Sequence, residues 1–256
     1  MFLFLRENSL SVPHITNSQQ TKTKLAQGYR RSTRCMELFA IVLFFLTELY
    51  LFTQVIPDII QHPFIVFPAL LLGYIGADFV SGLVHWIGDT WGNPETPFFG
   101  PIFIRPFREH HVDQTAITRH DFIETNGSNC FASILLLLPT ILLLRGTYHS
   151  FFIIFLLSTI TSLTLSIFAT NQFHKWAHLL HPPRMIAWLQ AKRLILSPMH
   201  HARHHRVPYD QYYCITVGWL NVLLEKFHFF RFAEHLITKC TGAIARRNDL
   251  ELLNTS

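Results

Sequence analysis

Residues 148–178 read YHSFFIIFLLSTITSLTLSIFATNQFHKWAH, and this stretch combines the two features that organise the whole chain. Its first part, Tyr148 to Thr170, contains no Asp, Glu, Lys or Arg. It is long enough for a helix that crosses a bilayer core, which needs about 20 residues. The last part places His174 and His178 four residues apart, so on a helix their imidazoles share one face. The stretch therefore predicts a membrane-spanning helix that ends in two histidines.

The composition of the full chain also favours a membrane protein. Half of the 256 residues are hydrophobic and only 14% are charged, against about 25% in an average soluble domain. Three further apolar runs are present: Met36 to Ile56, Pro63 to about Leu83, and Cys130 to Leu144, which is short for a span unless it begins near Phe122. Runs of this length are read as transmembrane rather than as buried soluble helices. We therefore expect an all-α fold, an integral membrane four-helix bundle.

The placement of Lys and Arg predicts the orientation of this bundle, because cytoplasmic segments are enriched in these residues. Basic residues precede the first span, follow the fourth and occur within residues 90–129, whereas the other two connections have Arg145 alone. We expect both termini and a histidine-rich helical cap in the cytoplasm, at a bacterial inner membrane or the endoplasmic reticulum.

The expected organisation has three parts along the chain. They are a polar, disordered tail over residues 1–35, a membrane domain over 36–240 and a C-terminal tail over 241–256. Met36 directly precedes the first apolar run and is an alternative start of translation.

Histidine is the unusual residue of this sequence, with 16 copies, as many as Asp and Glu combined. Ten of them fall in four segments that the expected orientation places at the cytoplasmic face. Several are four residues apart, which aims two imidazoles at one point from one helix. We predict as metal ligands His85, His110, His111, His120, His174, His178, His200, His201, His204 and His205.

This number of histidines predicts a pair of metal ions. Imidazole binds Fe, Zn, Cu and Ni, but a single zinc site is complete with four ligands. The four Cys are scattered without a Cys-x-x-Cys pair, which argues against a disulfide framework or a Cys-type zinc site. His120 lies in a loop, where it either binds metal, orients a ligand or contacts a head group. Four nearby carboxylates are expected to accept the free N–H of ligating rings: Asp89, Glu109, Asp121 and Glu124.

The segments around these histidines resemble the plasmanylethanolamine desaturase family, a Kua-like lipid desaturase domain. The resemblance is carried by RPFREHH at 105–111, TRHDFIET at 118–125, HKWAH at 174–178 and the His box at 200–205. It covers about residues 70–235. A related branch, the plant plastid phosphatidylglycerol trans-desaturase, shares Val207-Pro208-Tyr209.

The resemblance implies an oxygen-dependent lipid desaturase that makes the vinyl ether of plasmalogens in a membrane phospholipid. We expect two iron ions as cofactor, O2 as co-substrate and no catalytic residues beyond the metal ligands. Electrons must come from an external donor such as cytochrome b5 or a ferredoxin, because the sequence shows no flavin or haem motif. Three arginines are candidates to bind the phosphate head group or to pair with nearby carboxylates: Arg105, Arg108 and Arg119.

Other functions fit parts of the same pattern. A fatty-acyl desaturase of the phosphatidylglycerol type, or a hydroxylase of the same di-iron class, would use the same ligands. A membrane metal transporter would place ionisable residues midway through its spans, whereas these candidates lie at span ends. A non-enzymatic scaffold would not need a complete ligand set. No nucleic-acid partner is expected, because the basic residues flank apolar segments rather than forming one patch.

Overall fold

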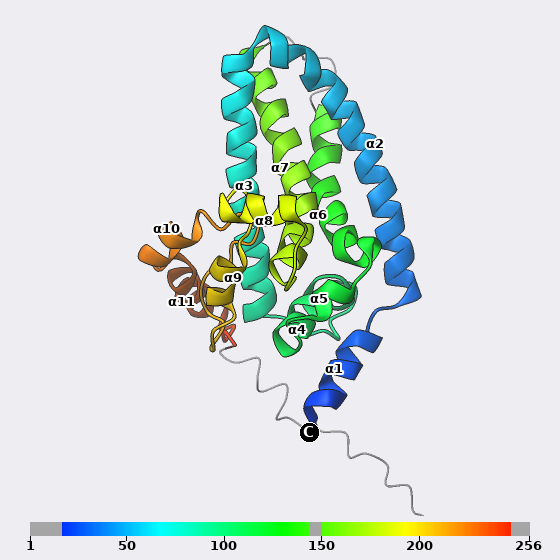
Figure 1. Cartoon of the computed structure of the whole chain (residues 1–256), viewed down its shortest axis with the longest axis vertical. Helices are drawn as coiled ribbons and strands as arrows, with labels where there is room; N and C mark the ends of the chain where they lie inside the picture. The colour runs from blue at the N-terminus through cyan, green and yellow to red at the C-terminus, as the bar shows by residue number, and fades with distance from the viewer. Residues whose placement is uncertain (1–16, 144–149, 247–256) are drawn as a thin grey trace, which may run out of the picture.

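Four long helices form the body of the molecule in the computed structural model, which describes residues 17–143 and 150–246. They are α2 (Arg31–Gln61), α3 (Pro63–Thr90), α6 (Phe122–Leu143) and α7 (Phe151–Ala177), and each is long and apolar enough to cross a membrane. Figure 1 shows them side by side along the long axis. The prediction of an all-α fold with four spans is therefore confirmed for the described residues, and the third span does begin at Phe122.

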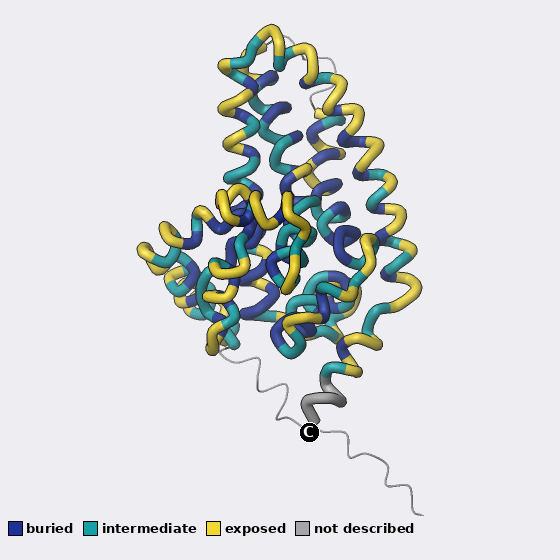
Figure 2. The backbone as a smooth tube through the Cα atoms, viewed as in Figure 1, coloured by how far each residue is buried: buried dark blue, intermediate teal, exposed yellow. Residues whose placement is uncertain are grey.

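Close packing between the spans depends on small residues. Helix α7 lies between α3 and α6, and α2 packs against α6 (Figure 1). A Cβ atom added at Gly73 of α3 would lie 2.4 Å from the Thr159 carbonyl oxygen of α7, so the two backbones nearly touch. Small residues permit such approaches in membrane bundles, where lipid gives no hydrophobic drive to helix association. Large apolar side chains such as Phe64 point outward, and the outer faces are widely exposed (Figure 2).

The remaining helices gather at one end of the bundle and form a cap (Figure 1). The cap carries the histidine-rich segments, as the sequence predicted. Its elements are the π-helix η1 (Gly100–Ile104), α4 (Arg105–Val112), α5 (Ala116–Arg119), α8 (Arg184–Ala191), α9 (Pro198–His204), α10 (Asn221–Lys226) and α11 (Phe229–Thr241).

Asp78 attaches the cap to the bundle. This carboxylate is fully buried within α3. Its Oδ1 accepts the backbone N–H groups of Val217 at 2.9 Å and Gly218 at 2.8 Å, and its Oδ2 accepts that of Leu220 at 3.1 Å. Hydrogen bonds to a carboxylate are stronger than those between neutral groups. They hold the segment before α10 against the helix that also carries His85.

Residues 17–35 differ from the expected disordered tail. Residues Asn17–Gln27 form α1, and α2 already begins at Arg31. Leu25 of α1 is buried, and its carbonyl oxygen accepts a hydrogen bond from Arg105 at 3.4 Å. Polar composition predicted no structure here, but contact with α4 gives α1 a partner that the local sequence does not reveal. Residues 1–16, 144–149 and 247–256, which include the outer parts of both expected tails and Arg145, lie outside the described residues.

Candidate metal centre

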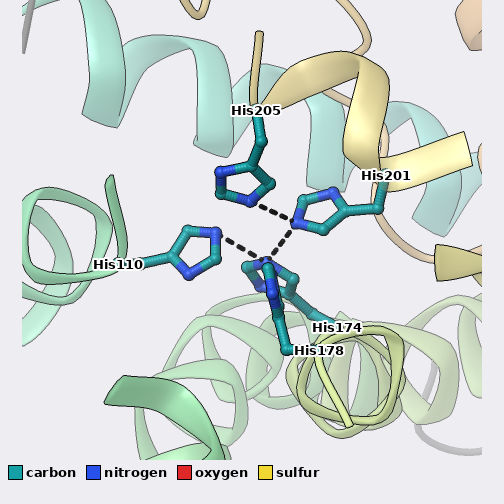
Figure 3. A group of neighbouring side chains, drawn as sticks. All are labelled: His110, His174, His178, His201 and His205. Carbon is teal, nitrogen blue, oxygen red and sulfur yellow. Dashed lines mark hydrogen bonds between the residues drawn. The ribbon is translucent and has the colours of Figure 1, made fainter. Parts of the chain in front are cut away.

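Five histidines from three helices converge at the centre of the cap (Figure 3). The Nε2 atom of His174 lies 3.1 Å from that of His110 and 2.8 Å from that of His201. The Nε2 atom of His205 lies 2.9 Å from that of His201. The five-histidine group is His110, His174, His178, His201 and His205, and each offers a nitrogen within 4.8 Å of the others.

The chemistry of this five-histidine group fits a metal ion better than a hydrogen-bonded cluster. A neutral imidazole has one donor and one acceptor nitrogen, so the facing Nε2 atoms of His110, His174 and His201 cannot all be satisfied by one another. The Nε2 atom of His178 is buried and makes no hydrogen bond among the described residues. A cation at the point of convergence would satisfy all of these nitrogens at once.

Burial keeps these rings in the form that binds metal. It lowers the pKa of His178 to about 4 and holds the pKa values of His110 and His201 well below the usual value, with the neighbouring imidazoles adding to the effect. The rings are therefore neutral at pH 7. Neutral imidazole is the ligand form, so metal binding here needs no prior loss of protons near pH 7.

A second group of three histidines and one carboxylate lies beside the first. It consists of His85, Asp89, His111 and His204. The Oδ2 atom of Asp89 lies 3.3 Å from His85 Nε2, 3.5 Å from His204 Nε2 and 3.7 Å from His111 Nε2. The sequence predicted that Asp89 would accept the N–H of a ligating ring, but the structure places its oxygen among the potential ligand atoms themselves.

Adjacent histidines divide between the two groups. On α4, His110 faces the five-histidine group and His111 faces the second group. At the end of α9, His205 belongs to the first group and His204 to the second. Consecutive residues on a helix differ in direction by about 100°. The two rings of each His-His pair therefore point toward different groups.

Main-chain carbonyl groups orient the rings of the second group. His85 Nδ1 lies 3.1 Å from the Tyr213 carbonyl oxygen, and His204 Nδ1 lies 2.9 Å from that of Gln211. A carbonyl oxygen only accepts, so each Nδ1 carries the proton and each Nε2 presents its lone pair to the site. Partners of this kind fix the tautomer and direction of metal-binding imidazoles. No local sequence pattern marks Tyr213 or Gln211 for this role.

His120 lies in a third group, with Glu109 and Glu124. Its Nε2 atom is 3.5 Å from Glu109 Oε2 and 3.7 Å from Glu124 Oε1. The buried guanidinium of Arg105 bridges both carboxylates, at 2.6 Å to Glu109 and 2.9 Å to Glu124. Because Arg105 already compensates these charges, we regard this group as an ion-pair network beside the metal groups.

His200 is the predicted ligand that the structure directs elsewhere. The first two groups contain eight of the ten predicted ligands, and only His120 and His200 lie outside them. The Nε2 atom of His200 lies 3.2 Å from Asn221 Nδ2, and its ring packs 5.1 Å from that of Tyr212. The neighbouring His201 faces the first group instead.

The remaining charged candidates make structural contacts. Arg108 is fully buried and donates to the Asp89 carbonyl oxygen at 2.8 Å. Arg119 pairs with Asp113 at 2.6 Å. Asp121 caps the start of α6 and pairs with Arg34 at 2.7 Å. Of the two alternatives for the arginines, carboxylate pairing is what the structure displays for Arg105 and Arg119.

A cleft leads to the five-histidine group from the side of the bundle. Its inner lobe is lined by His110 and His174, among others. An outer lobe lies between α3, α6 and α7, and its lining is mostly apolar, with Val80, Ala132 and Ile167 among its residues. The two lobes share lining residues such as Val84 and Phe107, so the outer lobe adjoins the one that His110 and His174 line.

Comparison with known proteins identifies relatives over most of the chain. Residues 74–248 match the lipid desaturase domain family. The chain is 48% identical over 233 residues to a plasmanylethanolamine desaturase from Myxococcus xanthus, covering 91% of this chain and 82% of the relative. It is 44% identical over 202 residues to plasmanylethanolamine desaturase 1 from Mus musculus, covering 75% and 72%.

A more distant relative comes from a plant. The chain is 37% identical over 160 residues to the chloroplastic fatty acid desaturase 4 of Arabidopsis thaliana, covering 60% of this chain and 46% of the relative. No solved structure matches the chain.

Proposed function

The chain belongs to the lipid desaturase domain family and is a multi-pass membrane desaturase, and from this premise we propose that it converts plasmanylethanolamine to plasmalogen. The proposed reaction introduces a double bond between the first two carbons of the 1-O-alkyl chain. The observation that carries the proposal is the 48% identity to a plasmanylethanolamine desaturase over 91% of the chain. The apolar cleft that reaches the five-histidine group agrees with a lipid-chain substrate.

Two iron ions fit the two ligand groups, one in each. The first would be held by the five-histidine group and the second by His85, Asp89, His111 and His204. Imidazoles with one carboxylate are typical ligands of non-haem Fe(II) oxygenases. The five imidazoles of the first group exceed the four ligands that complete a zinc site, which supports iron. When bound, the iron ions supply the oxygen and redox chemistry, while the protein supplies ligands, orientation and a shielded site.

The overall reaction balances with one O2 and an external electron donor. Two hydrogens leave adjacent carbons of the alkyl chain as the double bond forms. Together with two electrons and two protons from outside, they reduce O2 to two water molecules. A one-electron carrier such as cytochrome b5 or a ferredoxin is the proposed donor, because no segment of the sequence resembles a flavin or haem site.

The protein's own residues prepare the site for this reaction. The side chains of His85 and His204 are fully buried, which excludes bulk water from the second group. The Nδ1 contacts of these two rings fix where their lone pairs point. Preorganised, dry ligand groups avoid rearrangement during the reaction.

The proposed orientation places the cap and both termini in the cytoplasm. The support is the excess of Lys and Arg in the segments of the cap and before α2. A soluble electron donor would then reach the cap directly.

A fatty-acyl desaturase activity is the second candidate, favoured by the similarity to the Arabidopsis fatty acid desaturase 4. A hydroxylase of the same di-iron class would require the same ligands. We rank the fatty-acyl substrate second to the alkyl ether. The identity to the plant relative is 37%, against 48% for the bacterial plasmanylethanolamine desaturase, and the chain covers only 46% of the plant relative. Membership in a desaturase family removes the support for the transporter and scaffold alternatives.

The test is lipid analysis in a host that lacks plasmalogens and receives an alkyl-ether phospholipid. We expect acid-labile vinyl-ether lipid to accumulate only when the protein, iron, O2 and a donor are all present. The matched control is the same host with His201→Ala. A double bond in an acyl chain would support the second candidate, and the absence of vinyl ether under complete conditions would refute the alkyl-ether substrate.

A further inference from the structure

Two asparagines lie in the cleft wall where its inner and outer lobes meet. Asn129 of α6 and Asn171 of α7 line both lobes. The other residues common to both lobes are apolar: Val84, Phe103 and Phe107. The junction of the lobes is therefore formed by three apolar side chains and these two amides.

The two amides differ in what they contact. Asn129 Nδ2 donates to the Ile167 carbonyl oxygen at 2.7 Å, which links α6 to α7. The Asn171 side chain is half-buried and makes no hydrogen bond among the described residues. Because the side chain is only half-buried and lines both lobes, its amide can reach a molecule in the cleft. Asn171 therefore has donor capacity that the folded chain does not use.

Asn171 also has a defined place relative to the metal groups. It precedes His174 by three residues on α7, so the two side chains share one face about 4.5 Å apart along the helix axis. His174 and His110 line the same inner lobe as Asn171. On its other side, the outer lobe offers the apolar surface of Val80 and Ile167. A lipid chain in the outer lobe would begin beside Asn171.

We propose that Asn171 donates a hydrogen bond to the oxygen atom that joins the alkyl chain to glycerol. The identity of this oxygen as an ether rests on the proposed function. An ether oxygen accepts but cannot donate, and the amide Nδ2 supplies the donor. The reacting carbons are one and two bonds from that oxygen, so this contact places them beside His174. An apolar lobe alone would let the chain slide, because it contacts every CH2 group alike.

The test compares binding of two lipids to the iron-loaded protein without O2, so that no turnover occurs. One lipid is the 1-O-alkyl phospholipid, and the other carries CH2 in place of the ether oxygen. A neutral hydrogen bond contributes about 1 kcal/mol, so the protein should bind the ether about fivefold more tightly. Asn171→Leu should bind both lipids equally while its iron content stays unchanged. Gln172→Leu, the neighbouring amide outside the cleft wall, should keep the fivefold preference.

Two outcomes would overturn the inference: an undiminished preference in Asn171→Leu, or equal binding of both lipids by the unaltered protein. If Asn171→Leu does not fold, Asn171→Ala removes the donor without added bulk and must lose the preference as well. The binding comparison is independent of catalysis. A protein that prefers the ether but forms no vinyl ether would contradict the proposed function and leave the role of Asn171 standing.

Discussion

The Nε2 atoms of His174 and His201 lie 2.8 Å apart, although 27 residues separate these histidines in the sequence. His174 lies in the last turn of a membrane span, and His201 lies on the short helix α9 of the cap. The contact therefore joins the bundle to the cap at the proposed metal site. Two imidazoles at this distance cannot both present lone pairs without a proton or a cation between them.

His201→Ala and His200→Ala form a matched pair of adjacent substitutions. Loss of His201 should lower the iron content and abolish turnover, because its ring belongs to the five-histidine group. Loss of His200 should leave the iron content unchanged, because its ring faces Asn221 and Tyr212. Metal analysis of the two purified variants measures the difference. Equal iron loss in both would show that the ligand assignment on α9 is wrong.

Asp89→Asn should reduce the bound iron from about two ions to about one per chain. The change removes the one carboxylate of the second group and leaves the five-histidine group intact. An amide oxygen is a weaker ligand than a carboxylate, and it brings no charge to offset that of the metal. Iron stoichiometry and the metal's absorption or Mössbauer spectrum would follow the loss. Two fully occupied sites in the variant would place Asp89 outside the ligand set.

Asp78→Asn should destabilise the fold without changing the chemistry of the metal groups. The buried carboxylate accepts three backbone N–H groups, and in the variant an NH2 group would face at least one of them. Hydrogen bonds to a charged group contribute about 1.5–3 kcal/mol each, so we expect a loss of about 2–3 kcal/mol. Thermal unfolding in detergent measures it. An unchanged unfolding temperature would mean that Asp78 does not anchor the cap.

Gly73→Ala and Gly76→Ala test the close approach of α3 and α7. A Cβ atom at Gly73 would lie 2.4 Å from the Thr159 carbonyl oxygen, so the two backbones must separate. At Gly76 the nearest atom is the flexible end of Leu163, at 3.3 Å. We expect a destabilisation of about 1–3 kcal/mol for Gly73→Ala and a much smaller effect for Gly76→Ala. Similar unfolding temperatures for both would contradict the backbone contact.

The exposed thiols of Cys35 and Cys240 report the proposed orientation. A membrane-impermeant maleimide should label both from the cytoplasmic face and neither from the opposite face. Gln61→Cys in a chain with both thiols replaced by Ser provides the control, because Gln61 lies at the other end of α2. That thiol should react from the opposite face alone. The reverse pattern would invert the topology and place the cap outside the cytoplasm.

The number and approximate position of the spans could be predicted from the local sequence. Apolar length is a local property, and the transfer of an uncharged run into lipid is favourable whatever the rest of the chain does. Helical periodicity likewise paired His174 with His178 and His201 with His205 correctly, because residues four apart share a face in any helix. Both pairs lie in the five-histidine group.

Which ring faces which group depends on the tertiary structure. The same i,i+4 spacing joins His200 to His204, but the structure turns His200 toward Asn221 and brings His204 beside Asp89. It also places an oxygen of Asp89 among the potential ligand atoms and Asn171 where the two lobes of the cleft meet. Spacing along one helix fixes only relative directions on that helix. The absolute direction depends on how α3, α4, α7 and α9 pack against one another. Contacts between residues distant in the sequence, such as those of Asp78 and Gly73, determine this packing.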